Sequence, residues 1–471
     1  MSRRLLKDTA LYALTGVATK LIGALLLPFI TRLLSPELYG SVDLISLVGL
    51  FAIELVTLGS DFALALYFHE ATLDRRRLVG SLWLARLLLG LFMGLIGHAL
   101  APWLAIQLLE RSDQQTILAL RLGLWSQLAN GIIGLWFTTL RQESKALRLF
   151  GLTVLRVAAT ALLTIGWMLQ SSQRLSAYFG AMLVVDCLLA LGLTLLMRGQ
   201  LGKPDWQLLH PLLGKGLGFL PRSIYFVAMT LINRQILLHF GSLEQIGHYA
   251  AATKISFIVW IVISAANQAW LPYSLAIANT PTANASYRQY LTSYTMLLGA
   301  ATTGLALFAP ELLRILTTGD YLPAAPAVGW YAVNLMAIGL LTVVATGLTI
   351  TKATAVLGQT SLLSAILNVG LAIMLVPWLG LVGAAIAAAG DQLIAAWLVY
   401  RAAQKRYPID FDIKAVLAWL GLTIACVALA SWLPLAFSWP LIGLKLALVG
   451  VWLGCCWRWG QPKMLLSLLR K

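Results

Sequence analysis

Residues 79–100 read V-G-S-L-W-L-A-R-L-L-L-G-L-F-M-G-L-I-G-H-A-L and carry one charge, Arg86. Three arginines, Arg75, Arg76 and Arg77, come just before this apolar run. A helix of roughly 20 mostly apolar residues is long enough to cross the hydrocarbon core of a bilayer. The run therefore predicts a membrane-spanning helix whose basic end lies at the membrane surface.

The rest of the chain has the same character. Of 471 residues, 60% are hydrophobic and only 11% are charged, whereas a soluble domain is usually about 25% charged. This composition excludes a soluble enzyme, a disordered protein and a nucleic-acid-binding module. The net charge of +16 does not indicate nucleic acid, because the basic residues form no dense block and lie between apolar runs.

Fourteen apolar windows of spanning length can be placed along the chain. The connections between them are short, so no soluble domain fits between spans. An even number of spans places both termini on the same side of the membrane. The predicted windows are 11–32, 41–66, 79–100, 117–138, 150–170, 177–197, 217–239, 248–276, 290–312, 326–350, 358–377, 381–400, 415–433 and 437–457.

The basic residues orient these spans. With a cytoplasmic N-terminus, 22 lysines and arginines fall in the inner segments, and only Arg111, Arg174 and Arg314 fall in outer loops. Cytoplasmic loops of membrane proteins carry the excess of Lys and Arg. We therefore predict that both termini are cytoplasmic and that the basic residues favour contact with anionic lipid at the inner leaflet.

A short internal repeat suggests how the spans are grouped. Residues 35–40 read S-P-E-L-Y-G and residues 242–247 read S-L-E-Q-I-G, so S-x-E-x-x-G recurs after six spans. Because six is even, the two halves have the same orientation, as in other two-lobed transporters. We expect an all-α polytopic membrane protein with two six-helix lobes around a central cavity. The expected domains are 1–198, 199–402 and an appended pair of spans with a cytoplasmic tail, 403–471.

Nine basic residues remain inside the predicted spans. A charge that faces lipid near the bilayer centre costs roughly 2.5–3.5 kcal/mol. So many are tolerable only if most face a wet cavity, pair with acids or extend to the membrane surface. Arg32, Arg121 and Arg222 lie near span ends, where extension to the surface is open to them. The nine are Lys20, Arg32, Arg86, Arg121, Arg156, Arg222, Arg234, Lys254 and Lys445.

Five acids also lie inside spans: Asp43, Glu54, Asp61, Asp186 and Asp391. The first three are on the second span, and Glu54 and Asp61 are two helical turns apart and share a face. The acids inside the spans either pair with cavity cations or form a site for a coupling proton or sodium ion. With nine bases against five acids, the cavity is predicted to be cationic and to select an anion, such as a phosphate that arginine binds bidentately.

Three stretches resemble the polysaccharide and O-antigen flippases, the oligosaccharide-lipid branch of the superfamily that also contains the multidrug-and-toxin exporters. The first lies within residues 6–47 and includes P-F-I-T-R-L-L-S-P-E-L-Y-G at 28–40. The second is I-G-H-Y-A-A-A-T-K-I at 246–255, followed by Q-A-W-L-P-Y at 268–273. The third is L-N-V-G-L-A-I-M-L-V-P-W-L-G-L-V-G-A-A-I-A at 367–387. The resemblance covers nearly the whole chain, and the three stretches together are specific for the branch, not for a substrate.

The resemblance implies a multi-pass protein of the bacterial cytoplasmic (inner) membrane. Such a protein moves an undecaprenyl-pyrophosphate-linked oligosaccharide, an O-antigen or exopolysaccharide repeat unit, from the inner to the outer leaflet by alternating access. The lipid bilayer holds its lipid tail, and the polysaccharide polymerase machinery is a candidate partner. Nucleic acid is not expected as a partner.

The resemblance also implies which side chains bind substrate. Lumen-facing cations would hold the pyrophosphate and glycan, and the matching positions are Lys20, Arg32, Arg234 and Lys254, of which only Arg32 and Lys254 lie inside the quoted motifs. The second span departs from a purely cationic site because it carries acids and no base. The full expected substrate-binding set is Lys20, Arg32, Arg86, Arg222, Arg234 and Lys254, with Asp43, Glu54 and Asp61 as ion-coupling candidates.

Three alternatives stay open. A drug or cation antiporter of the same fold should have an acidic cavity, which the excess of bases disfavours. A lipid II flippase shares the chemistry and differs only in the glycan. A membrane enzyme is disfavoured because the longest outer connection, 101–116, has no histidine and few acids. We therefore expect no catalytic residue, metal or cofactor.

Overall fold

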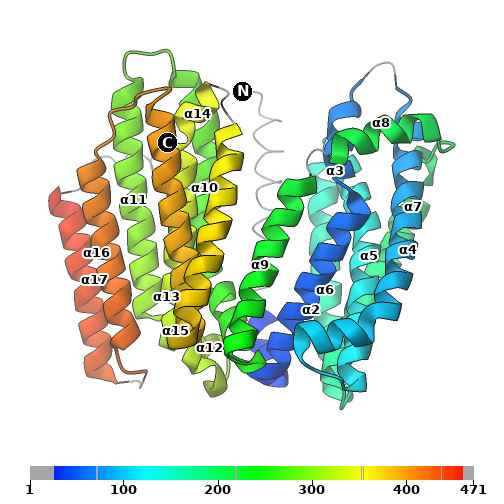
Figure 1. The fold of residues 1–471 in the computed structure, drawn as a ribbon, viewed down its shortest axis with the longest axis horizontal. Coiled ribbons are helices and arrows are strands. Elements are labelled where there is room, and N and C mark those ends of the chain that lie inside the picture. Colours follow the sequence, from blue (N-terminus) through cyan, green and yellow to red (C-terminus); the bar gives the residue numbers. More distant parts are fainter. Residues whose placement is uncertain are drawn as a thin grey trace. The chain divides into compact units, whose positions relative to one another are not determined.

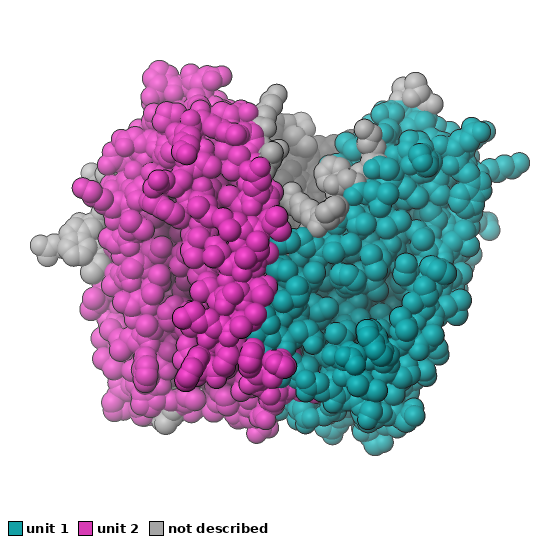
Figure 2. All heavy atoms as spheres, viewed as in Figure 1, with its two compact units in different colours: residues 1–238 teal, residues 239–471 magenta. Residues whose placement is uncertain are grey.

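The computed structural model of the protein describes residues 26–70, 73–217, 220–351, 353, 355–435 and 438–459. All regular structure in these ranges is helical (Figure 1). Packing divides the chain into two compact units, residues Met1–Leu238 and His239–Lys471, which Figure 2 colours separately.

The first unit is organised around one central helix, α5, which packs against α2, α3, α4, α6 and α7. Ile133 and Trp136 of α5 share an apolar core with Leu82 of α4 and Leu212 of α8. The elements are α2 (Pro36–Thr57), α3 (Ser60–Tyr67), α4 (Arg75–Leu109), α5 (Gln114–Gln142), α6 (Ala146–Gln170), α7 (Arg174–Leu196), η1 (Arg198–Gln200), α8 (Trp206–Leu217) and α9 (Leu220–Phe240).

The predicted second span, 41–66, is a broken helix. Leu58 and Gly59 have positive φ angles of 46° and 68°, and they separate α2 from α3. A Cβ on Gly59 would lie 2.2 Å from the carbonyl oxygen of Gly216, so only glycine permits both this turn and the close approach of α8. Residues 198–216, which connect the predicted spans 177–197 and 217–239, are largely helical, and helix α8 among them packs on α3 and α4.

The second unit is organised in the same way around α13, which packs against α10, α11, α15 and α16. Val333 of α13 shares an apolar core with Ala389 of α15 and Val427 of α16. The elements are α10 (Leu243–Ile277), α11 (Ala283–Leu307), α12 (Ala309–Leu316), η2 (Gly319–Ala324), α13 (Ala325–Val344), α14 (Thr346–Ile350), α15 (Ala355–Gln404), α16 (Ile413–Trp432) and α17 (Trp439–Trp459).

The long element α15 is a hairpin of two helices. Gly380 has φ 55° and ψ −131°, which interrupts the helix. A hydrogen bond of 2.7 Å joins Ser364 to Asp391, and 27 residues of straight helix would separate them by roughly 40 Å. A Cβ on Gly383 would lie 2.5 Å from the carbonyl oxygen of Leu375. The small residue Gly383 therefore permits the two helices of the hairpin to pack closely.

Within the described residues, nine helices are long and apolar enough to cross a membrane, or ten if α11 and α12, bent by 64°, are one span. The hairpin α15 enters this number once but contains two predicted spans. Helices α9 and α17 lie where spans 217–239 and 437–457 were predicted. Most of the predicted first span, 11–32, lies outside the described residues. The expected all-α polytopic fold is confirmed, and the chain is a multi-pass membrane protein.

The predicted domains 1–198, 199–402 and 403–471 group the predicted spans into lobes, whereas the two units group residues that pack together. Packing places nearly all of α9 in the first unit. The lobe boundaries stay a prediction.

Candidate functional site

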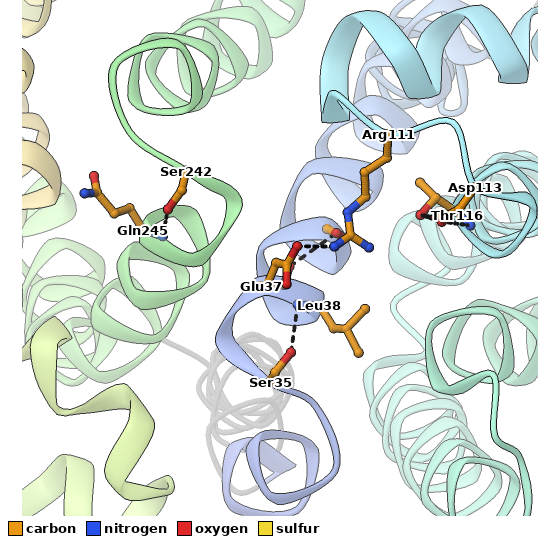
Figure 3. Close-up of polar contacts among 9 residues, drawn as sticks. Ser35, Glu37, Leu38, Arg111, Asp113, Thr116, Ser242 and Gln245 are labelled. Carbon is orange, nitrogen blue, oxygen red and sulfur yellow. Dashed lines mark hydrogen bonds and ion pairs between the residues drawn. The ribbon is translucent and has the colours of Figure 1, made fainter.

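The two copies of the predicted repeat begin two long helices in the same way. Ser35 is the N-cap of α2 and accepts a hydrogen bond from the backbone N–H of Leu38 at 3.4 Å. Ser242 is the N-cap of α10 and accepts one from Gln245 at 3.3 Å. Figure 3 shows both caps. A serine in this position satisfies a helix N–H that has no partner within the helix, so the recurring S-x-E-x-x-G is a helix-start signal.

The acid of the first copy also has a partner. Glu37, in the first turn of α2, forms an ion pair with Arg111, which Figure 3 shows extending from the connection between α4 and α5. In the same connection Asp113 caps α5 by accepting from the backbone N–H of Thr116. Arg111, one of the three bases predicted outside, therefore fixes the predicted outer end of this unit.

Arg86 is the most completely bound of the predicted substrate cations. Its guanidinium Nε and Nη2 donate to Ser60 Oγ at 3.0 and 2.8 Å, and Nη1 donates to the carbonyl oxygen of Gly131 at 2.9 Å. Nη2 also lies 2.8 Å from Asp61 Oδ1, which accepts from Thr138 Oγ1 at 2.9 Å. The break at Gly59 places Ser60 and Asp61 opposite α4, and Arg86 joins α3, α4 and α5.

A second predicted cation has its own acid. Arg234 of α9 is buried, and its Nε lies 2.9 Å from Asp43 Oδ2 of α2. Outside the candidate set, Arg156 of α6 pairs with Asp186 of α7 at 2.7 Å. Each such pair cancels one charge that would otherwise be exposed to hydrocarbon, and each fixes two helices of the first unit together.

The first unit contains a polar cavity of about 550 Å³ next to the Arg86 network. Glu54 and Asp61 both line it, so the two acids predicted to share a face do meet one space although the helix between them is broken. Arg141, Gln142 and Thr138 of α5 also line it. The cavity thus contains two carboxylates and one guanidinium in its wall and is not purely cationic.

The other predicted substrate cations stand apart from this network. Arg32 is exposed on the helical stretch 26–33, and Lys254 is exposed on α10; within the described ranges neither forms an ion pair. Lys20 and the side chain of Arg222 lie outside the described residues. The structure therefore brings Arg86 to Asp61 and Arg234 to Asp43, and it places Asp61 and Glu54 on one cavity; the four substrate cations that it describes do not form one set.

The second unit uses its embedded charges differently. Lys445 of α17, one of the nine bases inside predicted spans, has its Nζ 2.6 Å from Glu311 Oε1 of α12 and 5.9 Å from the ring centre of Phe308. Asp391 is buried within the α15 hairpin and accepts from Ser364 Oγ.

Sequence reasoning missed the contribution of the end of α5. Arg141 was counted among the bases of the inner segments because it follows the predicted span 117–138, and Thr138 was not considered. Their spacing of three residues places them on one helix face, and this signal would have extended the helix to Gln142 and both side chains into the cavity.

Solved structures of flippases and exporters have this fold. The structure described as "Lipid II flippase MurJ, inward closed conformation" matches with a TM-score of 0.71 at 14% identity, over 95% of this chain and 99% of that chain. An inward-facing multidrug resistance MATE family transporter of the MOP superfamily matches with a TM-score of 0.69 at 16% identity, over 85% and 96% of the two chains. A mutant of the Vibrio cholerae MATE transporter VcmN matches with a TM-score of 0.58 at 14% identity, over 86% and 96%.

Sequence comparison supplies the family. No curated protein matches the chain. Residues 5–278, however, match the family described as "Polysaccharide biosynthesis protein". Because this match covers more than half of the chain, and because the fold around it is that of flippases and exporters, the protein belongs to the polysaccharide biosynthesis protein family.

Proposed function

We propose that the protein is a flippase that moves an undecaprenyl-pyrophosphate-linked oligosaccharide from the inner to the outer leaflet of a bacterial cytoplasmic membrane by alternating access. The observation that carries the proposal is the polysaccharide-family match on a chain with a flippase and exporter fold. A polar headgroup cannot cross hydrocarbon unaided, because its charges and hydroxyls would lose their hydration without compensation. A helical protein with polar interior surface removes most of this barrier.

The embedded cations that the structure describes differ in whether they form an ion pair, and we assign the two kinds different roles in this function. Arg86 and Arg234 have acidic partners and contribute no net charge, so they serve mainly to hold helices together. Arg32 and Lys254 are exposed and form no ion pair within the described ranges. We assign the binding of the anionic pyrophosphate chiefly to Arg32 and Lys254, with Lys20 and Arg222 as further candidates.

Flipping in liposomes tests the proposal. An undecaprenyl-pyrophosphate oligosaccharide is placed in one leaflet, and its appearance in the other is measured with and without protein. We expect wild-type protein to flip the lipid and the double variant Arg32→Ala, Lys254→Ala to flip it at least about tenfold more slowly, because each charge-assisted contact is worth about 1.5–3 kcal/mol.

The matched control removes two charges elsewhere. Lys405 and Arg406 are exposed in the connection after α15, and Lys405→Ala, Arg406→Ala should keep the wild-type rate. Flipping of lipid II but not of an oligosaccharide with another glycan would change the substrate to the cell-wall precursor. Export of ethidium without lipid flipping would replace the proposal by a drug or cation antiporter.

The proposal includes coupling to an ion gradient, with Asp43, Glu54 and Asp61 as candidates. Asp43 and Asp61 form ion pairs with Arg234 and Arg86, and Glu54 lines the same cavity as Asp61. The test is gradient-dependent flipping by Asp43→Asn, Glu54→Gln and Asp61→Asn. Unchanged gradient dependence in all three would remove coupling from this helix.

A further inference from the structure

The α15 hairpin builds a buried polar cluster around one carboxyl. Asp391, 4% exposed, lies on the second helix of the hairpin, and its Oδ2 accepts from Ser364 Oγ at 2.7 Å and from Gln392 Nε2 at 3.0 Å. Ser364, 3% exposed, comes from the first helix. The amide of Asn368, one turn further along that helix, lies beside the same carboxyl. The folding of the hairpin therefore assembles the cluster.

Asp391 differs from the embedded aspartates of the first unit because it has no basic partner among the residues that the structure describes. Asp43, Asp61 and Asp186 each lie within 2.9 Å of an arginine nitrogen. A buried carboxylate without a cation is so costly that the group is normally neutralised instead. Something other than a side chain must therefore balance this charge.

The helices packed against the hairpin do not supply that balance. Helices α13 and α14 carry no Lys, Arg, His, Asp or Glu. His248 of α10 already contacts the carbonyl oxygen of Asp320 at 2.8 Å, and Lys254 is exposed. None of the titratable groups on the packed elements forms a hydrogen bond or ion pair with Asp391. These groups are Tyr331 of α13, Glu244, His248, Tyr249, Lys254 and Tyr273 of α10, Lys414 and Cys426 of α16, and Tyr400 and Arg401 of α15 itself.

The cluster is also short of hydrogen-bond donors. Asp391 Oδ1 and Asn368 Oδ1 are both buried acceptors without a partner. A proton on Asp391 Oδ1 removes the charge and turns one of these acceptors into a donor. A metal ion fits less well, because hard cations such as Mg²⁺ and Ca²⁺ take six or more oxygen ligands, and in the described part of this cluster two buried side-chain oxygens lack a partner.

The depth of the cluster suits a coupling site. Asp391 follows the hairpin turn at Gly380 by eleven residues, or about 16 Å of helix. The hydrocarbon core is about 30 Å thick, so the carboxyl lies near its middle. A group at this depth exchanges protons with one side or the other only when the protein changes conformation.

We propose that Asp391 is a proton-binding site, loaded in the conformation described here, that couples transport to a proton gradient. The coupling part rests on the proposed flippase function. The proton site itself does not, and it is tested separately on purified full-length protein.

The first experiment uses dicyclohexylcarbodiimide, an apolar reagent that adds to protonated carboxyls. Trypsin then releases residues 353–401 and residues 175–198, each of which contains one acid, Asp391 and Asp186 respectively. Asp186 is the matched internal control, because it is buried as deeply but paired with Arg156. We expect at least about tenfold more label on Asp391 than on Asp186, and less label on Asp391 as the pH rises.

Each outcome has a defined meaning. Label on Asp391 that is absent in Asp391→Asn and insensitive to sodium supports the proton site. Equal labelling of Asp186 and Asp391, or none on Asp391 at any pH, overturns it. Protection by sodium, with choline as the control salt, also overturns it in favour of a metal cation. Asp391→Asn keeps the shape of the side chain, and a thermal melt verifies that this variant is folded.

The second experiment addresses coupling. Flipping is measured in liposomes with and without an imposed pH gradient. We expect the gradient to accelerate the wild type and to leave Asp391→Asn unchanged, while flipping without a gradient persists in the variant. An accelerated variant overturns the coupling role. Labelling of Asp391 in a protein that flips no lipid at all would overturn the proposed function but keep the proton site.

Discussion

Arg86 shows why an embedded cation need not bind substrate. Its side chain is 1% exposed, and its donors are used by Asp61, Ser60 and the carbonyl oxygen of Gly131. The partner Asp61 is 44% exposed, so removing Arg86 costs less than breaking a fully buried pair, about 1–3 kcal/mol for the hydrogen bonds lost by Asp61, Ser60 and Gly131. We expect Arg86→Ala to lower the free energy of unfolding by about that amount, measured by denaturant unfolding in detergent.

The double variant separates charge balance from charge itself. Arg86→Met, Asp61→Asn removes both charges and should recover part of the loss, because no carboxylate is left without its cation and the Asn amide oxygen can still accept from Thr138. Arg77→Ala is the matched control: Arg77 pairs with Asp74 at 3.7 Å but is exposed, so its loss should cost under about 1 kcal/mol. Similar losses in Arg77→Ala and Arg86→Ala would contradict the structural role given to Arg86.

At the scale of the element, the break in the second span depends on one glycine. Gly59 has a φ of 68°, and an added Cβ would lie 2.2 Å from the carbonyl oxygen of Gly216. We expect Gly59→Ala to lower the free energy of unfolding by about 1–3 kcal/mol through backbone strain. Gly151→Ala, in helix α6 with no atom within 4 Å of an added Cβ, should instead raise it by about 0.5–1 kcal/mol. Loss of stability in both variants would show that the effect is not specific to the break.

The start of α16 should respond to pH. The backbone N–H of Ala415 and the guanidinium of Arg288 hold the pKa of the Asp412 carboxyl below its usual range. Because the folded pKa is lowered, this stabilisation is present above about pH 4 and is lost as the pH falls through the folded pKa.

We therefore expect Asp412→Ala to reduce stability by about 1 kcal/mol at neutral pH, and its difference from the wild type to shrink below about pH 4. Thermal melts across this pH range measure it. Asp410→Ala is the control, because Asp410 also lies near Arg288, at 3.4 Å, but is not the N-cap of α16. A difference that grows on acidification would contradict the assignment.

The elements themselves were predictable to different degrees. Long apolar windows identified the spans because a bilayer demands about 20 apolar residues whatever the tertiary packing. The break at Gly59 and the helix in 198–216 were not predictable, since they depend on a contact with Gly216, far away in the sequence. The repeat was visible because capping is local, so Ser35 and Ser242 act within their own first turns.

At the scale of the whole molecule, the excess of nine bases over five acids predicted a cationic interior but could not say which bases remain uncompensated. Pairing depends on which helices are neighbours: Arg234 meets Asp43 from 191 residues away. Sequence reasoning therefore named Asp43 and Asp61, with Glu54, as ion-coupling candidates without seeing the arginine partners of the two aspartates, and it listed Asp391 as an embedded acid without including it among the candidates.

Because paired charges cancel, we expect the rate at which an anionic headgroup is transported to depend on the net charge of the interior and not on the number of cations. Arg234→Gln, Asp43→Asn removes one charge of each sign and should keep flipping within a few-fold of the wild type. Lys254→Gln removes one exposed charge and should slow flipping about tenfold or more. Arg234→Gln alone should be impaired through stability, because the Asp43 carboxylate then loses its partner. The liposome assay, with melting temperatures measured in parallel, separates these effects. Equal loss of flipping in the double variant and in Lys254→Gln, with both proteins stably folded, would assign substrate binding to Arg234 itself and reject charge balance as the selecting principle.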